Sequence, residues 1–268
     1  MIDLFQIPCG HLPVKYLGVP LITSRLSYTD CKPLVDSITA RIRSWTVKFL
    51  PFTGRLQLIK SIICSIQSFW NSLFVLPKRI INQVEQIIRR FLWKGPTLAK
   101  GGAKVAWDDV TYPLEEGGLG IRRLHTWNVA SMGTHLWSLC IPSPTSGWAQ
   151  WARANLLQGH SLWDVSIPTN SSWIWRKLLK MRTLFRNQIK HIVGDGNDTW
   201  LWFDDWLPLG PIQAGMGNRV IYDVGLPRTA RVSAIVRENS WHWPIANSPE
   251  LLILKETTIS IPPPDSTR

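Results

Sequence analysis

The chain has 268 residues, which is long enough to bury a core in one or two domains. Lys and Arg outnumber Asp and Glu by 30 to 18, and this excess favours a polyanion such as nucleic acid as the partner. The sequence has no long uncharged apolar stretch, and its start lacks a basic segment followed by an apolar one, so we expect no membrane partner and no signal peptide.

The four cysteines, Cys9, Cys31, Cys64 and Cys140, are far apart in the sequence and form no C-x-x-C pair. A zinc cage needs closely spaced Cys or His ligands, so the sequence predicts no metal site of this kind. Unpaired thiols are typical of a reducing compartment, and we therefore expect an intracellular protein, with no choice made between nucleus and cytoplasm.

The charge is uneven along the chain. Residues 1–100 hold 14 basic and 4 acidic side chains, residues 101–190 hold 10 and 5, and residues 191–268 hold 6 and 9. A surface that binds nucleic acid is therefore expected in the first two thirds of the chain.

The first elements predicted are a hairpin-like segment over 12–24 and three helices between residues 31 and 95. Gly and Pro punctuate the hairpin-like segment, and Pro51 and Pro77 separate the helices. Apolar side chains recur at steps of three and four, at Leu34, Ile38, Ile42, Trp45 and Phe49, then after the expected N-cap Thr53 at Leu56, Ile59, Ile63, Ile66 and Trp70, and finally at Ile80, Val84, Ile87, Ile88, Phe91 and Leu92. Three such helices predict a bundle with a basic outer face.

A loop rich in Gly and Lys follows, and residues 107–191 predict further helices in a Trp-rich segment. Beyond it, "IVGDGNDTWLWFDDW" predicts a β-hairpin near 190–206, because apolar and aromatic runs flank a Gly-Asp-Gly-Asn turn. The Pro-rich tail "SIPPPDSTR" is expected to be loose. The predicted fold class is mainly α, with an N-terminal three-helix bundle, a Trp-rich helical connector and a short C-terminal β-hairpin.

The chain contains 16 tryptophans, many of them in pairs two or three residues apart. They could serve as stacking platforms for nucleobases or as an aromatic core. The core interpretation is favoured, because most of these side chains lie outside the strongly basic part of the sequence.

Phe203-Asp204-Asp205 resembles the aromatic-x-Asp-Asp signature of a polymerase palm, and paired carboxylates can hold Mg²⁺. A turn can carry the same letters, and adjacent residues of a strand point to opposite faces, so we favour a structural turn. Asp195 and Asp198 are interpreted likewise as turn residues. A hydrolase or nuclease built on these four carboxylates stays as a further hypothesis. The six His residues form no metal motif, and no nucleophile elbow or P-loop occurs, so no catalytic residue is predicted.

"KYLGVPL" begins at Lys15, and it is followed in order by "FLPFTGRLQLIKSIICSIQSFWNSLFVLPKRI", "FLWKG", "KVAWDDVTYPLEEGGLGIRRLHTWNVA", "SWIWRKLLKMR", "VGDGNDTWLWFDDWLPLGP" and "RVSAIVRENSWHWP". The series resembles the reverse transcriptases of plant LINE-type non-LTR retrotransposons. "KYLGVPL" is similar to the primer grip, the next four motifs to the thumb and connector, and the last two to later stretches of the same polyproteins. The resemblance covers nearly the whole chain.

The resemblance implies a primer-grip-like hairpin at the end of a palm over 1–30, a thumb-like bundle over 31–100, a Trp-rich connector over 101–191, and a β-hairpin with a loose tail over 192–268. In that family the catalytic Asp residues, which use Mg²⁺, precede the primer grip, whereas Asp204 and Asp205 follow it. Only 14 residues precede Lys15, and no Cys/His-rich zinc-binding segment follows the last motif. The expectation is a fragment that is not an enzyme and holds no cofactor.

The thumb of a reverse transcriptase holds template and primer by their phosphates, which carry no base information. The resemblance therefore assigns nucleic-acid contacts to Lys15, Tyr16, Leu17, Gly18, Arg41, Arg43, Arg55, Lys60, Lys78, Arg79, Arg89, Arg90 and Lys94. The expected partner is RNA or DNA, bound weakly and without sequence preference, and no small-molecule substrate is indicated. The alternative is a decayed open reading frame whose product is an inert polypeptide.

Overall fold

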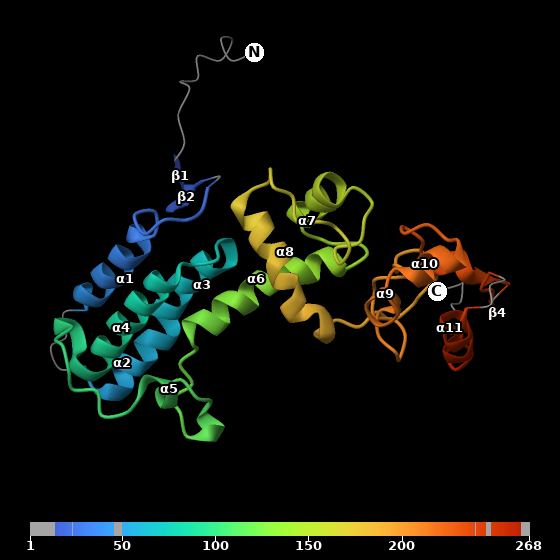
Figure 1. Ribbon diagram of the computed structural model, residues 1–268. Coiled ribbons are helices and arrows are strands. Elements are labelled where there is room, and N and C mark those ends of the chain that lie inside the picture. Colours follow the sequence, from blue (N-terminus) through green and yellow to red (C-terminus); the bar gives the residue numbers. More distant parts are fainter. Residues whose placement is uncertain (1–13, 23, 46–49, 239, 245–247, 264–268) are drawn as a thin grey trace, which may run out of the picture. The chain divides into compact units, whose positions relative to one another are not determined.

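The computed structural model describes residues 14–22, 24–45, 50–238, 240–244 and 248–263, and it is mainly helical, which confirms the predicted fold class at this level (Figure 1). The chain forms two compact units. The first unit comprises Met1–Thr134 with Asn170–Lys177, and the second comprises His135–Thr169 with Leu178–Arg268. Each unit has a hydrophobic core of its own. No helix in the described part of the chain has both the length and the apolar character that crossing a membrane requires.

The first unit begins with a short antiparallel hairpin, as the hairpin-like pattern over 12–24 predicts. Strand β1 (Val14–Tyr16) pairs with β2 (Val19–Leu21) through a two-residue turn at Leu17 and Gly18. Both turn residues have positive φ, 51° and 81°. This is the backbone that a tight two-residue hairpin needs, and Gly supplies it without steric cost.

Four helices build the core of the first unit: α1 (Lys32–Ser44), α2 (Phe52–Leu58), α3 (Cys64–Leu73) and α4 (Lys78–Lys94). A π-helical turn, Ile59–Ile63, makes α2 and α3 one continuous helical stretch. In Figure 1 α1, α4 and this continuous stretch lie side by side, and α4 contacts both α1 and α2. The predicted apolar stripes of α1 and α4 are buried, so their basic residues remain outside. The end of the first stripe at Phe49 lies outside the described residues.

Proline marks the start of two of these helices. Pro51 and Pro77 are the N-cap residues of α2 and α4, both with extended backbone. The N-cap predicted at Thr53 is therefore wrong by two positions. Proline suits a helix start because it fixes φ and lacks the N–H group that would stay without an intrahelical acceptor there.

The link between α3 and α4 is held by a buried amide. The side chain of Asn128, on α6 (Leu124–Cys140), accepts a hydrogen bond from Leu76 N at 2.9 Å and donates one to Phe74 O at 2.7 Å. Asn128 is 2% exposed. A short helix, α5 (Trp107–Val110), precedes α6. The amide thus satisfies two backbone groups that the helices leave without partners.

The second unit contains the remaining part of α6, α7 (Gly147–Ala152), most of α8 (Trp173–Phe185), α9 (Ile212–Met216), α10 (Arg219–Val224), the strands β3 (Val236–Arg237) and β4 (Ser240–Trp241), and α11 (Pro249–Ile259). Its core is aromatic: Trp163, Trp202, Phe203 and Trp206 are all buried. The core interpretation therefore holds for these tryptophans. It fails for Trp137 and Trp151, which are 52% and 54% exposed.

Two expectations for the C-terminal part are wrong in detail. The short hairpin lies at 236–241 and not near 190–206, where Trp200 instead forms an isolated antiparallel bridge with Arg231. Helices α9, α10 and α11 occupy residues that were expected to follow a hairpin without regular structure. The beginning of the tail is held, since Trp241 Nε1 donates to Ile261 O at 2.9 Å. Residues 264–268 of the tail lie outside the described residues.

The buried amide generates a stability prediction. Asn128→Ala should lower the free energy of unfolding of the full chain by about 1–3 kcal/mol, because it leaves Leu76 N–H and Phe74 C=O buried without partners. Asn128→Asp keeps the acceptor for Leu76 N–H and should cost less at low pH than at neutral pH, where it buries a charge. Urea denaturation followed by circular dichroism measures both. The exposed neighbour His125→Ala is the control, and an equal loss in that variant would contradict the assignment.

Candidate functional site

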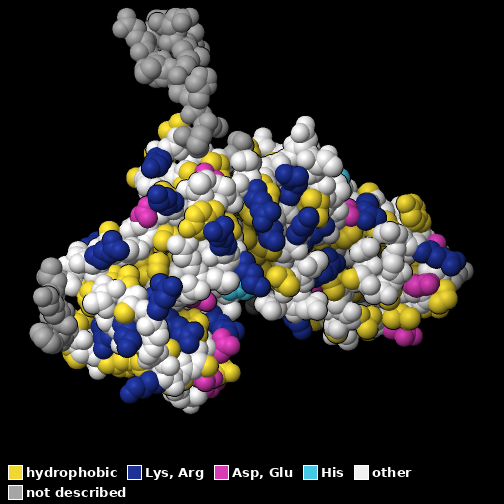
Figure 2. Space-filling model, turned by 60° about the vertical axis from the view of Figure 1, so that its left-hand side comes forward, with side chains coloured by type: hydrophobic (Ala, Val, Ile, Leu, Met, Phe, Trp, Pro, Cys, Tyr) yellow, Lys and Arg dark blue, Asp and Glu magenta, His cyan; other side chains and the backbone are white. Residues whose placement is uncertain are grey.

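All thirteen residues predicted to contact nucleic acid lie in the first unit, and the structure exposes ten of them. Lys15, Tyr16, Leu17, Gly18, Arg41, Arg43, Lys78, Arg79, Arg89 and Lys94 are exposed, and Arg55, Lys60 and Arg90 are half-buried. On the face that Figure 2 draws, Lys and Arg side chains occur in several groups, with hydrophobic and neutral side chains between them.

The charged residues of α4 have different surroundings. Glu85 lies on this helix, but its carboxylate accepts a hydrogen bond from Leu124 N at 3.1 Å and so caps the start of α6. Arg79 lies over the ring of Tyr28, with its guanidinium carbon 4.5 Å from the ring centroid. Among the residues that the structure describes, Arg89 and Lys94 form no ion pair, and both are exposed. Helix α4 thus presents cations that are free to meet phosphates.

Two of the predicted residues are placed differently from the expectation of an outward-facing cation. Arg55 is half-buried, its Nε has no hydrogen-bond partner, and its side chain lies next to Gly95. Lys60 is directed toward Gly120, with Nζ 3.4 Å from the position that a Cβ atom would take there. Helical periodicity places both residues off the apolar stripe. The 95–120 region nevertheless packs over them, and the local sequence pattern does not predict this contact.

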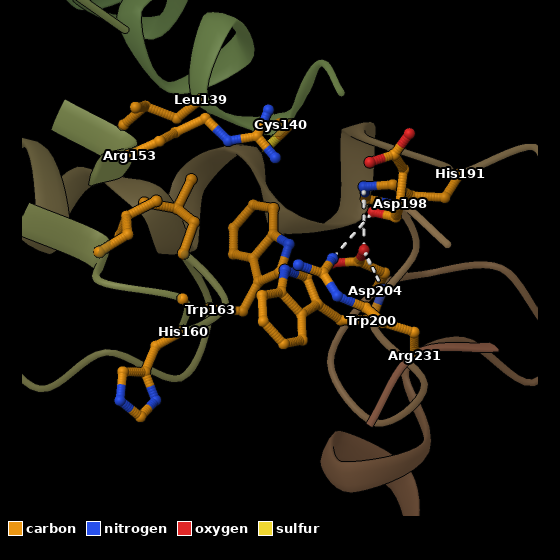
Figure 3. A pocket seen from close by; sticks show the side chains of 13 residues that line it. Leu139, Cys140, Arg153, His160, Trp163, His191, Asp198, Trp200, Asp204 and Arg231 are labelled. Carbon is orange, nitrogen blue, oxygen red and sulfur yellow. Dashed lines mark hydrogen bonds and ion pairs between the residues drawn. The ribbon is translucent and has the colours of Figure 1, made fainter. Parts of the chain in front are cut away.

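The second unit contains a small polar pocket of about 130 Å³ (Figure 3). In this view His191, Asp198, Asp204 and Arg231 gather on one side of the pocket, and His160 lies on the other. The segment around Trp200 is joined to residues 230–233 by backbone hydrogen bonds. Leu201 N donates to Ala230 O and Val232 N donates to Thr199 O, each at 3.0 Å.

Asp204 is the centre of this polar group. It is 3% exposed, accepts a hydrogen bond from Trp200 N at 2.8 Å, and lies 3.5 Å from His191 Nε2. Burial raises the pKa of the Asp204 carboxyl, and the nearby His191 and Arg231 oppose this shift. The guanidinium of Arg231 lies over the Trp200 ring, 3.3 Å from its centroid, and donates to Asp198 O at 3.1 Å. The carboxylate therefore closes the turn that follows Trp200.

Asp195 and Asp205 also take part in hydrogen bonds within this segment, whereas Asp198 lines the pocket together with Asp204. Asp195 accepts hydrogen bonds from Asn197 N and Asn197 Nδ2, both at 2.9 Å, and these bonds lower its pKa. The backbone carbonyl of Asp205 accepts from His191 N at 2.7 Å. In the described residues, no three His, Cys, Asp or Glu side chains are arranged to hold a metal ion. These contacts support the interpretation of the Asp residues as turn residues.

Steric crowding explains why residue 196 of this segment is a glycine. Its φ is +80°, and a Cβ atom built there would lie 2.8 Å from Ser233 N, so a larger residue would push residues 196 and 233 apart. Cys140, which also lines the pocket, has its pKa raised to about 12 by burial and by the charge of Asp204. Its thiol is therefore protonated and unreactive at neutral pH.

Comparison with known proteins finds similarity to two plant proteins. No family model matches it. It is 29% identical over 197 residues, 72% of its length, to an Arabidopsis thaliana protein whose name describes it as a ribonuclease H protein, and it covers 32% of that protein. It is 27% identical over 146 residues to an uncharacterized mitochondrial protein of the same plant, covering 53% of this chain and 94% of that protein. The chain thus spans about a third of the longer relative.

The burial of Asp204 generates a pH prediction. A carboxyl whose pKa is raised by folding contributes stability that is complete below its unfolded pKa of about 3.9 and is lost as the pH rises through the folded pKa. Asp204→Asn keeps an acceptor for Trp200 N–H without the charge. Its free energy of unfolding should therefore increase relative to that of the wild type as the pH rises from about 4 to neutral.

The control for this series is Asp195→Asn, for which the change of stability with pH should have the opposite sign. Hydrogen bonds lower the pKa of Asp195, so the wild type should gain stability relative to Asp195→Asn as the pH rises through the folded pKa to the unfolded pKa of about 3.9, and this difference should then change little up to neutral pH. Asp204→Ala, which removes the acceptor, should be less stable than Asp204→Asn at every pH. Urea denaturation at several pH values measures these differences. A stability gap between wild type and Asp204→Asn that does not change with pH would contradict the placement of a buried carboxyl at this position.

Proposed function

We propose that the chain is a reverse transcriptase-like fragment of non-LTR retroelement origin that binds RNA or DNA weakly and without sequence preference through the first unit. The exposed basic residues of α1 and α4, opposite buried apolar stripes, carry this proposal. Phosphate contacts made by such cations bind any sequence about equally. The ordered series of motifs from "KYLGVPL" to "RVSAIVRENSWHWP" supports the origin, and the name of the longer relative, a ribonuclease, agrees with an RNA partner.

The fragment is proposed to lack polymerase activity. The first carboxylate of Phe203-Asp204-Asp205 is buried, accepts a hydrogen bond from Trp200 N and is paired with His191. A metal-binding Asp in a polymerase must present free oxygens to Mg²⁺ beside a second carboxylate. The thumb-like role of α1 to α4 belongs to the same proposal and rests on the resemblance together with their exposed basic residues.

The first test is primer extension. The purified chain should not extend a primer when it is given a primed template, dNTPs and Mg²⁺. The reason is that the Asp204 carboxylate stabilises a turn and does not bind a metal ion. Extension would be read on a denaturing gel beside an active polymerase as the positive control. Template-dependent extension that disappears in Asp204→Ala and Asp205→Ala would overturn the proposal and assign the motif to catalysis.

The second test is binding to duplexes. Affinity should be on the order of 10⁻⁴–10⁻⁶ M near physiological salt and should fall steeply as salt increases, because phosphate contacts release counterions. The double variant Arg89→Glu and Arg90→Glu should weaken binding about equally for unrelated sequences. The matched charge reversal of Lys190 and Arg237, two exposed residues of the second unit, is the control. Binding that does not change with salt, or that depends more on the control pair, would contradict the proposal and favour the alternative of an inert polypeptide.

A further inference from the structure

The last turns of α4 and the loop that follows it form a concave basic site in the first unit. Arg89, Arg90 and Trp93 line it from the helix, and Lys100 and Gly101 line it from the loop, around a cavity of about 330 Å³. We refer to this site, between α4 and residues 95–104, as the α4 cup. Lys100 was not among the residues that sequence periodicity assigned to nucleic-acid contact, because it lies beyond the end of the helix.

The α4 cup differs from the other polar cavities in its charge. It is lined by three cations and by no acidic side chain. By contrast, the cavity near α5 contains Arg123 paired with Asp108, and the pocket of the second unit contains Asp198 and Asp204. None of the ion pairs found in the described part of the chain involves the three cations of the cup. Like charges held close together in a concavity attract an anion.

The loop geometry brings the third cation to the helix. Gly101 and Gly102 both have positive φ, 81° and 80°. A Cβ atom on Gly102 would lie 2.3 Å from Lys94 Cε and 2.7 Å from Lys94 Nζ. The two glycines therefore let the chain fold back onto the side chain of Lys94, and this return places Lys100 on the rim of the cavity that Arg89 and Arg90 form.

The wall of the α4 cup is fixed by packing. The ring of Trp93 lies against Phe52 of α2, with centroids 5.5 Å apart and a tilt of 42° between the rings. Trp93 is partly buried against the core of the first unit, so the helical side of the cup is anchored before any ligand arrives. A preformed wall reduces the ordering that binding would otherwise require.

We infer that the α4 cup binds a phosphate group of a nucleic-acid backbone. Guanidinium groups donate two parallel hydrogen bonds to phosphate oxygens, and a lysine adds a point charge on the opposite rim. This inference rests on the proposed function, since it names the position where that surface holds the backbone. A free polyphosphate has the same chemistry, so the experiment must separate the two sources.

The test compares two double variants with the same loss of charge. Arg89→Gln with Lys100→Gln removes two cations of the cup, whereas Arg25→Gln with Lys32→Gln removes two exposed cations of the same unit outside it. The cup variant should bind a short RNA–DNA duplex at least about tenfold more weakly than the control variant. The slope of log K against log salt should fall by about one for each phosphate contact removed. Unchanged circular dichroism spectra verify folding in both.

A variant that conserves charge tests the shape of the cup. Gly102→Ala should weaken duplex binding because a residue with a Cβ is strained at φ of +80° and shifts the loop that carries Lys100, while the net charge stays the same. Gly215→Ala, at a position with no atom within 4 Å of an added Cβ, is the control and should bind as the wild type does. Equal binding of Gly102→Ala and Gly215→Ala, with equal affinities of the two charge variants, would overturn the cup while leaving the proposed function intact.

Calorimetry with inorganic pyrophosphate separates the sources of phosphate. The expected result is that the wild type binds the duplex more tightly than pyrophosphate and that the cup variant is weakened toward both. If the wild type binds pyrophosphate at the cup and does not bind the duplex, the cup does not bind a nucleic-acid backbone. In that case the proposed function is contradicted as well. If it binds the duplex and the cup variant is no weaker than the control, the inference alone fails.

Discussion

Burial of the apolar stripe of α4 is the constraint on which the first unit depends. Ile80, Val84, Ile88 and Phe91 are fully or nearly fully buried, and each such side chain contributes about 1.5–3 kcal/mol when it leaves water. Their spacing fixes the rotation of the helix about its axis, because no other rotation removes all of them from water. The positions of the basic residues on α4 follow from that rotation and need no interaction of their own. The α4 cup is likewise a consequence of where the helix ends, since Gly95, with φ of 72°, turns the chain back beside the last helical turn.

The second unit depends on a polar constraint in addition to its aromatic core. The segment around Trp200 has no strand partner close in sequence, so its backbone groups bond to residues 230–233 and to the Asp204 carboxylate. Burying that carboxylate is costly, and the neighbouring His191 and Arg231 reduce the cost. Asp204 therefore has a sufficient explanation in the satisfaction of a backbone donor. In a polymerase the same Asp-Asp pair would bind a metal ion. Only the position in the fold distinguishes a metal ligand from an acceptor for a backbone N–H group.

Sequence periodicity predicted the elements in which one strong local signal dominates. Helices α1 and α4 carry regular apolar stripes, and their existence followed from the spacing alone. Helices α9 and α10 have five and six residues, which is too short for a stripe to be recognised, and α11 has apolar residues on several faces. The hairpin expected near 190–206 was misplaced because the alternation of Trp200 and Trp202 is also compatible with a turn. The partner of Trp200 is Arg231, and pairing across that distance leaves no trace in the local pattern. For the same reason the return of Lys100 to α4 could not be predicted from the loop sequence.

The distribution of tryptophan bears on how nucleic acid would be held. Stacking of unpaired bases needs aromatic rings that are both exposed and close to cations that hold the backbone. Trp137 and Trp151 are the exposed rings among those described above, and both belong to the second unit, whereas the predicted phosphate contacts belong to the first. Within the first unit, Trp70 is buried and Trp93 packs against Phe52. No tryptophan among the described residues of the first unit is exposed. Its exposed aromatic side chains are Tyr16, Tyr28, Phe69 and Tyr112, and of these only Tyr16 is among the predicted nucleic-acid contacts. Binding that rests on charge alone follows the phosphates, favours no base, and weakens with salt, which is the behaviour expected of a surface that grips a duplex and not of one that reads a single strand.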